Sequence, residues 1–203
     1  MRNLKEESRR TFNSQAETFD TGADGKHSRD AYPAILNVLD SINHETILDM
    51  GCGTGALLEQ VLQMKGTSNL YGLDLSEKML EQAHAKLNGR VTLVQGDSEY
   101  LPFESNYFDV VCCNDSFHHY PNPKAVISEV RRILVPGGFL IICDPYQQFG
   151  ALWITNFILR FSGTGNVRLY SQKEFCALLS EGFASVIWDK VGKTTHMVRG
   201  IKI

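Results

Sequence analysis

The fold is decided by residues 47–55, which read Ile47-Leu48-Asp49-Met50-Gly51-Cys52-Gly53-Thr54-Gly55. A short apolar run passes directly into three alternating glycines, and an amphipathic segment follows from Ala56. Glycine is needed where a chain turns tightly and where a ligand must reach the backbone with no side chain between them. A helix that begins behind such a loop offers free N–H groups to a polar ligand. The stretch therefore predicts a buried strand, a ligand-binding loop and a helix, although a purely structural turn has the same local pattern.

Around this stretch, short apolar runs alternate with amphipathic segments. We expect strands over residues 46–50, 69–75, 91–95, 108–114 and 138–144, and helices over residues 56–64, 76–87 and 123–134. This alternation indicates right-handed βαβ units and a parallel sheet. Two last strands, 184–191 and 196–203, are joined by a link that is too short for a helical crossover, so they form an antiparallel hairpin. The expected fold is α/β, with a seven-stranded, mostly parallel sheet, a terminal antiparallel hairpin and helices on both faces.

Two parts of the chain lie outside this regular pattern. Before the first strand we expect two helices, near residues 6–17 and 28–41. The insert 145–170 contains an apolar, aromatic segment, 149–161, which either packs into the core or forms a lid above the carboxyl ends of the strands. A helix over 171–181 follows, with Ser171 as its cap. Because no repeat or linker divides the chain, we expect one domain over residues 1–203.

Composition excludes several classes of protein. The chain is 43% hydrophobic and 21% charged, as in ordinary globular proteins, and its net charge of -3 gives no reason to expect a nucleic-acid partner. Five cysteines without a Cys-x-x-Cys pair argue against a disulfide framework and against a structural zinc site, so no metal is expected. The N-terminus lacks the apolar core of a signal peptide, and the longest apolar stretch is too short to cross a bilayer. We therefore expect a soluble, cytoplasmic protein.

Two acidic residues indicate which ligand the glycine loop binds. Asp74 lies 74 − 51 = 23 positions after Gly51, close to the ~20 expected for an acid that binds ribose hydroxyls, although an acid there could also stabilise the next helix N-terminus. Dinucleotide enzymes favour G-x-G-x-x-G, whereas this loop reads G-x-G-x-G. Asp49 would repel a pyrophosphate but suits a ligand with an ammonium and a sulfonium. The pattern therefore favours S-adenosyl-L-methionine and disfavours a nicotinamide-dependent oxidoreductase.

Over nearly its whole length, the chain resembles the class I S-adenosylmethionine-dependent methyltransferases. Residues 49–55 match the first motif of the family, 95–98 its adenine-contacting segment, 108–114 its fourth strand and 134–138 the turn before its fifth strand. The resemblance implies a Rossmann-like fold. It also implies that Asp74 binds the ribose, that Leu75 lies beside the adenine, and that Asp97 accepts from the exocyclic amine. The cofactor residues that it implies are Asp49, Gly51, Cys52, Gly53, Gly55, Asp74, Leu75, Met79, Gly96, Asp97, Ser98 and Asn114.

The resemblance also bears on the methyl acceptor. Residues 12–20 are similar to the N-terminal pattern of quinone-pathway C-methyltransferases, with Phe19 where those enzymes have tyrosine. Residues 114–120 lack the two prolines typical of enzymes that methylate exocyclic amines. Within this segment His119, rather than His118, is the candidate general base, although the pair could simply belong to the loop. We expect in-line methyl transfer to a small-molecule acceptor, and a non-catalytic S-adenosylmethionine-binding sensor or partner subunit remains the alternative.

Overall fold

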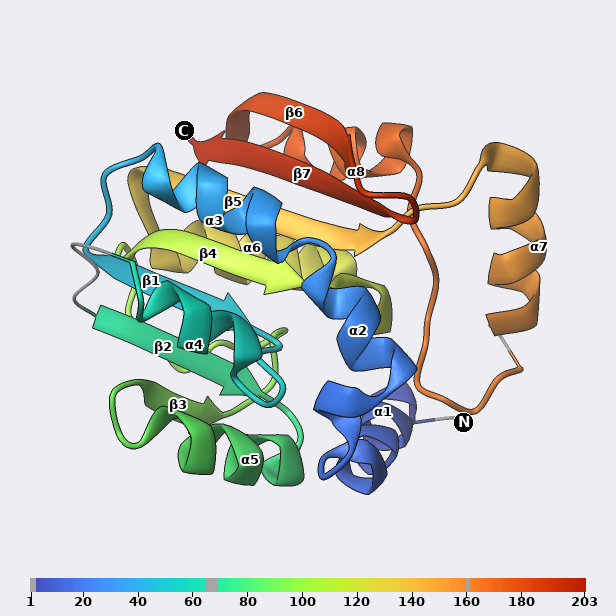
Figure 1. Ribbon diagram of the computed structural model, residues 1–203. Helices are drawn as coiled ribbons and strands as arrows, with labels where there is room; N and C mark the ends of the chain where they lie inside the picture. Colours follow the sequence, from blue (N-terminus) through green and yellow to red (C-terminus); the bar gives the residue numbers. More distant parts are fainter. Residues whose placement is uncertain (1–2, 65–68, 160) are drawn as a thin grey trace.

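The computed structural model describes residues 3–64, 69–159 and 161–203 (Figure 1). The N-terminal part forms α1 (Leu4–Gln15), the 3-10 turn η1 (Phe19–Thr21), α2 (Ala23–Arg29) and α3 (Tyr32–Asp40). The central part forms β1 (Thr46–Met50), α4 (Ala56–Val61), β2 (Asn69–Asp74), α5 (Glu77–Leu87), β3 (Thr92–Gln95), β4 (Phe108–Asn114), the 3-10 turn η2 (Phe117–His119), α6 (Pro123–Ile133) and β5 (Leu134–Pro145). The C-terminal part forms α7 (Phe149–Leu159), α8 (Gln172–Leu179), β6 (Phe183–Val191) and β7 (Thr195–Lys202).

The strands form one seven-stranded sheet in the order β3-β2-β1-β4-β5-β7-β6. Strands β1 to β5 are parallel, and β7 is antiparallel to both of its neighbours, β5 and β6. The predicted α/β, Rossmann-like sheet with a terminal antiparallel hairpin is therefore confirmed. Strand order changes direction between β1 and β4, and the loops that follow these two strands part from each other. A crevice at such a switch point is where open α/β sheets bind ligands.

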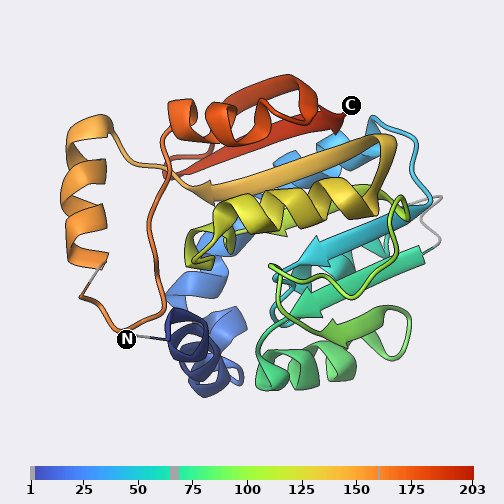
Figure 2. The ribbon, with the colours of Figure 1, turned by 180° about the vertical axis from the view of Figure 1, so that it is seen from behind.

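Helices cover both faces of the sheet, as predicted (Figures 1 and 2). One apolar core joins the sheet to α3, α4 and α5, and the other joins it to α6 and α8. Successive residues of a strand point to opposite faces, so Ile47 packs into the first core and Leu48 into the second. Burial on both faces explains why the central strands read as continuous apolar runs.

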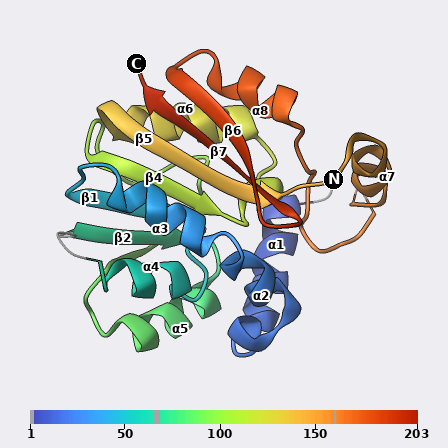
Figure 3. The ribbon, with the colours of Figure 1, turned by 45° about the horizontal axis from the view of Figure 1, so that its top comes forward.

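The N-terminal part corrects one expectation. The helix predicted over 28–41 is broken, because α2 ends at Arg29 and α3 begins at Tyr32. Pro33 lies in the first turn of α3, where its missing N–H is tolerated and where it favours a new helix start. Helices α1 and α2 lie beyond the carboxyl ends of β1 and β4 (Figure 3). They therefore lie at the switch point, whereas α3 packs on the sheet.

The insert contains a helix that stands away from the sheet. Helix α7 lies beyond the carboxyl end of β5 (Figures 1 and 3), with Trp153 73% and Phe157 56% exposed. Of the two expectations for this segment, packing into the core is therefore wrong for these aromatic side chains. Asn156 faces the protein instead, since its side chain bonds both the N–H and the carbonyl of Leu169. No helix within the described ranges is long and apolar enough to cross a bilayer.

Candidate functional site

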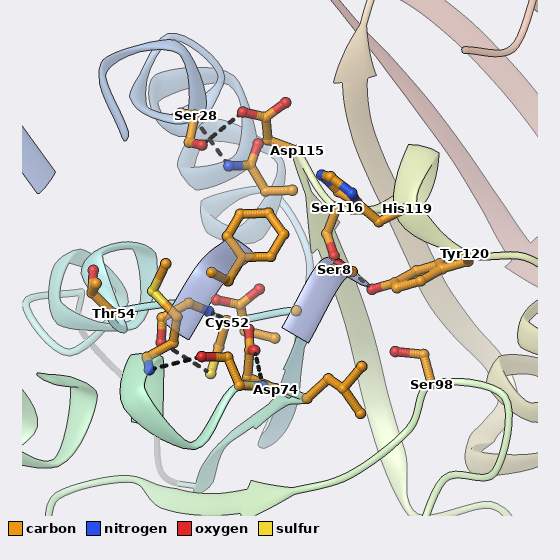
Figure 4. Close-up of a pocket in the computed structure, with 18 of the residues that line it drawn as sticks. Ser8, Ser28, Cys52, Thr54, Asp74, Ser98, Asp115, Ser116, His119 and Tyr120 are labelled. Carbon is orange, nitrogen blue, oxygen red and sulfur yellow. Dashed lines mark hydrogen bonds between the residues drawn. The ribbon is translucent and has the colours of Figure 1, made fainter. Parts of the chain in front are cut away.

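A cavity, here called the first cavity, opens at the carboxyl ends of β1, β2 and β4 and reaches α1 and α2 (Figure 4). Of the residues implied to bind the cofactor, all but Gly55 and Gly96 line it. These are Asp49, Gly51, Cys52, Gly53, Asp74, Leu75, Met79, Asp97, Ser98 and Asn114. His119 lines it as well.

The glycine loop needs its glycines for different reasons. Gly51 has φ +77° and lies so close to Ser116 that a Cβ would be 2.1 Å from the hydroxyl oxygen. Gly53 has φ +53°, and a Cβ there would meet no described atom within 4 Å. The backbone of Gly53 is therefore open to a ligand, whereas Gly51 lets the loop turn against the end of β4.

Gly55 and Gly96 serve packing instead. A Cβ on Gly55 would be 2.8 Å from Cδ1 of Leu87, so glycine lets the loop approach α5 closely. A Cβ on Gly96 would be 2.9 Å from Cδ1 of Leu73. Close packing therefore explains why these two positions are glycine, since neither residue lines the first cavity.

Asp74, at the end of β2, joins the glycine loop to the start of α5. Its Oδ2 accepts from the Gly53 N–H at 2.8 Å, and its Oδ1 accepts from the Ser76 N–H at 2.8 Å. Burial raises the pKa of Asp74, and the backbone N–H groups of Ser76, Gly53 and Leu75 oppose that shift. Asp74 therefore does contact the start of α5, as the alternative in the sequence analysis expected, and it also lines the first cavity.

Asp49 is the second acid of the first cavity, and it is only 3% exposed. Its Oδ1 has no hydrogen-bond partner among the residues that the structure describes. Burial, with a smaller contribution from the Asp74 carboxylate, raises the pKa of Asp49 to about 7. A cationic group bound here would favour the ionised carboxylate.

Helix α1 supplies a wall of the first cavity that the sequence analysis did not assign residue by residue. Lys5 Nζ lies 2.7 Å from Asp97 Oδ2 and 2.7 Å from Glu99 Oε2. The adenine contact implied for Asp97 therefore competes with an ion pair already formed. No local pattern could have found Lys5, because it meets Asp97 across 92 positions of sequence.

The 3-10 turn η1 docks on the glycine loop through Asp20. The Thr54 hydroxyl donates to Asp20 Oδ1 at 2.6 Å, and Lys86 Nζ donates to Asp20 Oδ2 at 2.6 Å. This docking places Phe19 on the wall of the first cavity. The pattern over residues 12–20 was the sequence signal for this segment.

A second cavity adjoins the first. Phe12, Phe19, Asp115 and His119 line both cavities, and the second is closed by residues of α1, α2 and the insert. The backbone of the insert reaches this place because the Val167 N–H donates to the carbonyl of His118 at 2.9 Å. Residues 164 and 166 of the insert line the second cavity, whereas none of the α7 side chains that the structure describes lines either one.

The two histidines of η2 point to different neighbours. His119 packs edge-on against Phe12 at 4.9 Å between ring centroids, and its Nδ1 has no partner within the described chain. Burial and the neighbouring His118 lower the pKa of His119 well below its usual value, so its imidazole is neutral. His118 instead bonds Asp144, with Nδ1 2.9 Å from Oδ1. The two rings pack together at 4.2 Å between centroids, but of the two residues only His119, which the sequence analysis preferred, lines the first cavity.

Comparison with known proteins identifies the family. Residues 48–142 match the family described as a methyltransferase domain. The demethylmenaquinone methyltransferase of Lactococcus lactis is 34% identical over 141 residues, which are 67% of this chain and 55% of the relative. The chain belongs to the class I S-adenosylmethionine-dependent methyltransferases. S-adenosylmethionine is the methyl donor that this family implies.

Further relatives agree with this assignment. The ubiquinone/menaquinone biosynthesis C-methyltransferase UbiE of Wigglesworthia glossinidia brevipalpis is 34% identical over 119 residues, 54% of this chain and 47% of the relative. The chain spans about half the length of these curated relatives. The methyltransferase solved with the Haloferax volcanii Trm112 activator superposes with a TM-score of 0.77 at 22% identity, over 94% of this chain and 97% of that one. This last likeness shows the shared fold.

Two histidine–aspartate pairs lie at the carboxyl ends of β4 and β5. His27 Nδ1 is 3.0 Å from Asp115 Oδ2, and the Ser28 hydroxyl donates to the same oxygen at 2.7 Å. The hydrogen bond to Asp115 raises the pKa of His27. Burial acts against charge on His118, but the carboxylate of Asp144 outweighs it and raises the pKa. Sequence reasoning missed Asp115 and Asp144, although each lies at the end of a predicted parallel strand.

Proposed function

We propose that this chain transfers a methyl group from S-adenosylmethionine in the first cavity to a small-molecule acceptor in the second. The observation that carries the proposal is the shared wall, on which Phe12, Phe19, Asp115 and His119 face both cavities. Two ligands bound on either side of this wall would meet at it. A sensor that only bound the cofactor would have no use for the second cavity.

The first cavity offers groups suited to each part of the cofactor. Asp74 accepts from the ribose hydroxyls, and the open backbone at Gly53 lets the nucleoside approach. Asp49 is a buried carboxylate with an unused oxygen, and it attracts the cationic methionine end. Leu75 and Met79 provide an apolar surface for the adenine. When bound, the sulfonium supplies an activated methyl group, so alignment and exclusion of water account for most of the catalysis.

His119 orients the acceptor. Its neutral imidazole has an unused, buried Nδ1 at the wall between the two cavities, so it can accept a hydrogen bond from an acceptor O–H or N–H. S-adenosylmethionine held in the first cavity would supply the methyl group to the nucleophilic atom of the acceptor, with S-adenosylhomocysteine as the leaving product. The proton of the acceptor would be lost to solvent, because burial disfavours a charged His119.

A small aromatic acceptor fits the second cavity best. Phe12 and Phe19 supply apolar rings, and Gln15, whose Oε1 is buried without a partner in the described chain, can accept from a hydroxyl. The Lactococcus lactis relative is named a demethylmenaquinone methyltransferase, which supports an aromatic acceptor in this chain. Acidic Asp24 and Asp115 on the same wall disfavour an anionic acceptor.

Turnover across a panel of acceptors tests the proposal. The purified chain would be incubated with S-adenosylmethionine and with phenols, hydroquinones, thiols or amines, and S-adenosylhomocysteine would be measured. We expect turnover with a phenol or hydroquinone, and micromolar binding of S-adenosylhomocysteine with no comparable binding of NAD. Cofactor binding without turnover on any acceptor would support the sensor instead, and NAD binding without a response to S-adenosylhomocysteine would refute both.

A further inference from the structure

Buried polar atoms without partners gather where β5 ends. Asp144 is fully buried, and its Oδ2 has no hydrogen-bond partner in the described parts of the chain. His196 lies directly opposite Asp144 in the β5–β7 register, is also fully buried, and has no described partner at either ring nitrogen. A buried carboxylate oxygen without a donor is costly, and such groups commonly mark a bound water or ion.

Potential metal ligands surround the same point. Asp115, His118 and Asp144 each offer one ligand atom, and these atoms lie within 4.8 Å of one another. His118 Nδ1 and Asp144 Oδ1 are hydrogen-bonded at 2.9 Å. A small separation, to about 3.3 Å, would place them as two ligands of a tetrahedral metal ion about 2.1 Å from each. The three residues come from the ends of two neighbouring parallel strands and from η2, so the sheet itself holds them together.

The charges of this cluster also favour a cation. Asp115 and Asp144 are two carboxylates at neighbouring strand ends, and no lysine or arginine of the described residues forms an ion pair with either. Among the described residues, the basic side chains paired with them are imidazoles, His27 on Asp115 and His118 on Asp144, and the neutral Ser28 hydroxyl also donates to Asp115. We propose that Asp115, His118 and Asp144 bind a divalent transition-metal ion at the edge of the second cavity.

A cation could reach this place. Asp115 and His118 line the second cavity, while Asp144 lies behind them, so the cluster forms part of the cavity wall and has an entry path. His27 and Ser28 would orient the Asp115 carboxylate, as residues that contact metal ligands commonly do. Three protein ligands leave a coordination position for water or for another ligand.

The donor set indicates the class of metal. One imidazole nitrogen with two carboxylate oxygens suits Zn²⁺ or Mn²⁺, whereas Mg²⁺ prefers oxygen ligands alone and retains its water. A cation here could hold an oxygen atom of the acceptor, and that role alone rests on the proposed function. Binding of the metal itself does not depend on methyl transfer.

Titration of chelator-treated, full-length protein with Zn²⁺, Mn²⁺ and Mg²⁺ by calorimetry tests the proposal. We expect one site per chain, tighter binding of Zn²⁺ than of Mn²⁺, and no saturable binding of Mg²⁺. The unaltered protein loaded with Co²⁺ should show visible absorption that differs from that of aqueous Co²⁺. If the protein binds none of these ions and leaves the Co²⁺ spectrum unchanged, the proposal is wrong, and the cluster consists of two hydrogen-bonded histidine–aspartate pairs without a metal ion.

Adjacent histidines provide a matched pair of variants. His118→Asn should weaken Zn²⁺ binding at least tenfold, and Asp144→Asn likewise, whereas His119→Asn should leave it unchanged because His119 is outside the ligand set. Equal losses in His118→Asn and His119→Asn, or none in either, would overturn the assignment in favour of adventitious binding. If His118→Asn or Asp144→Asn fails to fold by circular dichroism, the Co²⁺ spectrum of the unaltered protein decides. None of these readouts requires turnover, so the methyl-transfer proposal can fail separately.

Discussion

The carboxylate of Asp74 accepts a hydrogen bond from the backbone N–H of Gly53 at 2.8 Å. This bond joins the tip of β2 to the most open glycine of the loop, across 21 positions of sequence. The acid proposed to bind the ribose therefore also fixes the loop on which the nucleoside rests. A change at Asp74 should therefore alter both the conformation of the glycine loop and the affinity for the cofactor.

Replacement of Asp74 tests this coupling. Asp74→Ala removes the ribose contacts and the bond to Gly53, so the affinity for S-adenosylhomocysteine should fall by about 1.5–3 kcal/mol per charge-assisted bond lost. Asp74→Asn keeps an acceptor oxygen and should lose less. Calorimetry measures both, with Glu81→Ala as the control because Glu81 pairs with Lys78 on the exposed side of α5. An unchanged dissociation constant in folded Asp74→Ala would refute the ribose assignment.

The raised pKa of Asp49 predicts a pH dependence of stability. The pKa rises from 3.8 to about 7 on folding, so above pH ~4 the unfolded state releases a proton that the folded state keeps. The free energy of unfolding contributed by Asp49 therefore falls between pH ~4 and ~7, by about 4 kcal/mol at most, and stays low above pH 7. Urea unfolding of the ligand-free protein at pH 5 and pH 8 should show the part of this loss between pH 5 and 7, about 2.7 kcal/mol, and Asp49→Asn should remove it.

The same residue should link cofactor binding to pH. If Asp49 must ionise to hold a cationic ligand, the affinity for S-adenosylhomocysteine falls by up to about tenfold per pH unit below pH 7. Asp49→Asn should bind more weakly at pH 8, with a flatter pH profile. Parallel profiles in the two proteins would mean that Asp49 does not titrate on binding.

His119 should affect turnover more than cofactor binding. His119→Ala removes the proposed hydrogen-bond acceptor for the methyl acceptor, so kcat should fall by about 10², while the dissociation constant of S-adenosylhomocysteine stays within about twofold. His84→Ala is the control, since His84 is exposed on α5. A variant that keeps full turnover would show that alignment needs no help from His119.

The strengths and limits of sequence reasoning follow from the range of each interaction. The loop of residues 51–55 and Asp74 were predictable, because glycine conformation and strand periodicity are local properties. The pairing of Lys5 with Asp97 was not, because it depends on where α1 docks. The rings of His118 and His119 pack together, with their centroids 4.2 Å apart. The two residues therefore differ only in their other neighbours, Asp144 for His118 and Phe12 for His119, and the sequence does not show those neighbours.

The orientation of helix α7 also depends on contacts with residues that are distant in the sequence. Aromatic residues four positions apart indicate one face of a helix, but not whether that face meets the core or solvent. In the structure this face is exposed at Trp153, Phe157 and Phe161. The buried side chain of Leu152 and the bonds from Asn156 to Leu169 hold the opposite side of the helix against the protein. Those bonds involve residues 13 positions away, beyond any helical period.

The N-terminal segment and α7 are predicted to close together over bound cofactor. Residues 12–26 include Phe12 and Phe19 of the shared wall, and closure of α7 would cover its exposed aromatic side chains and exclude water from the second cavity. Hydrogen exchange with and without S-adenosylhomocysteine measures this directly. Amides in 12–26 and 149–161 should gain protection, while those of β1 and β4 should change little. Protection that is gained only in 12–26 would support closure of the N-terminal segment and rule out α7 as a lid. Equal protection of both segments with and without S-adenosylhomocysteine would show that neither segment moves.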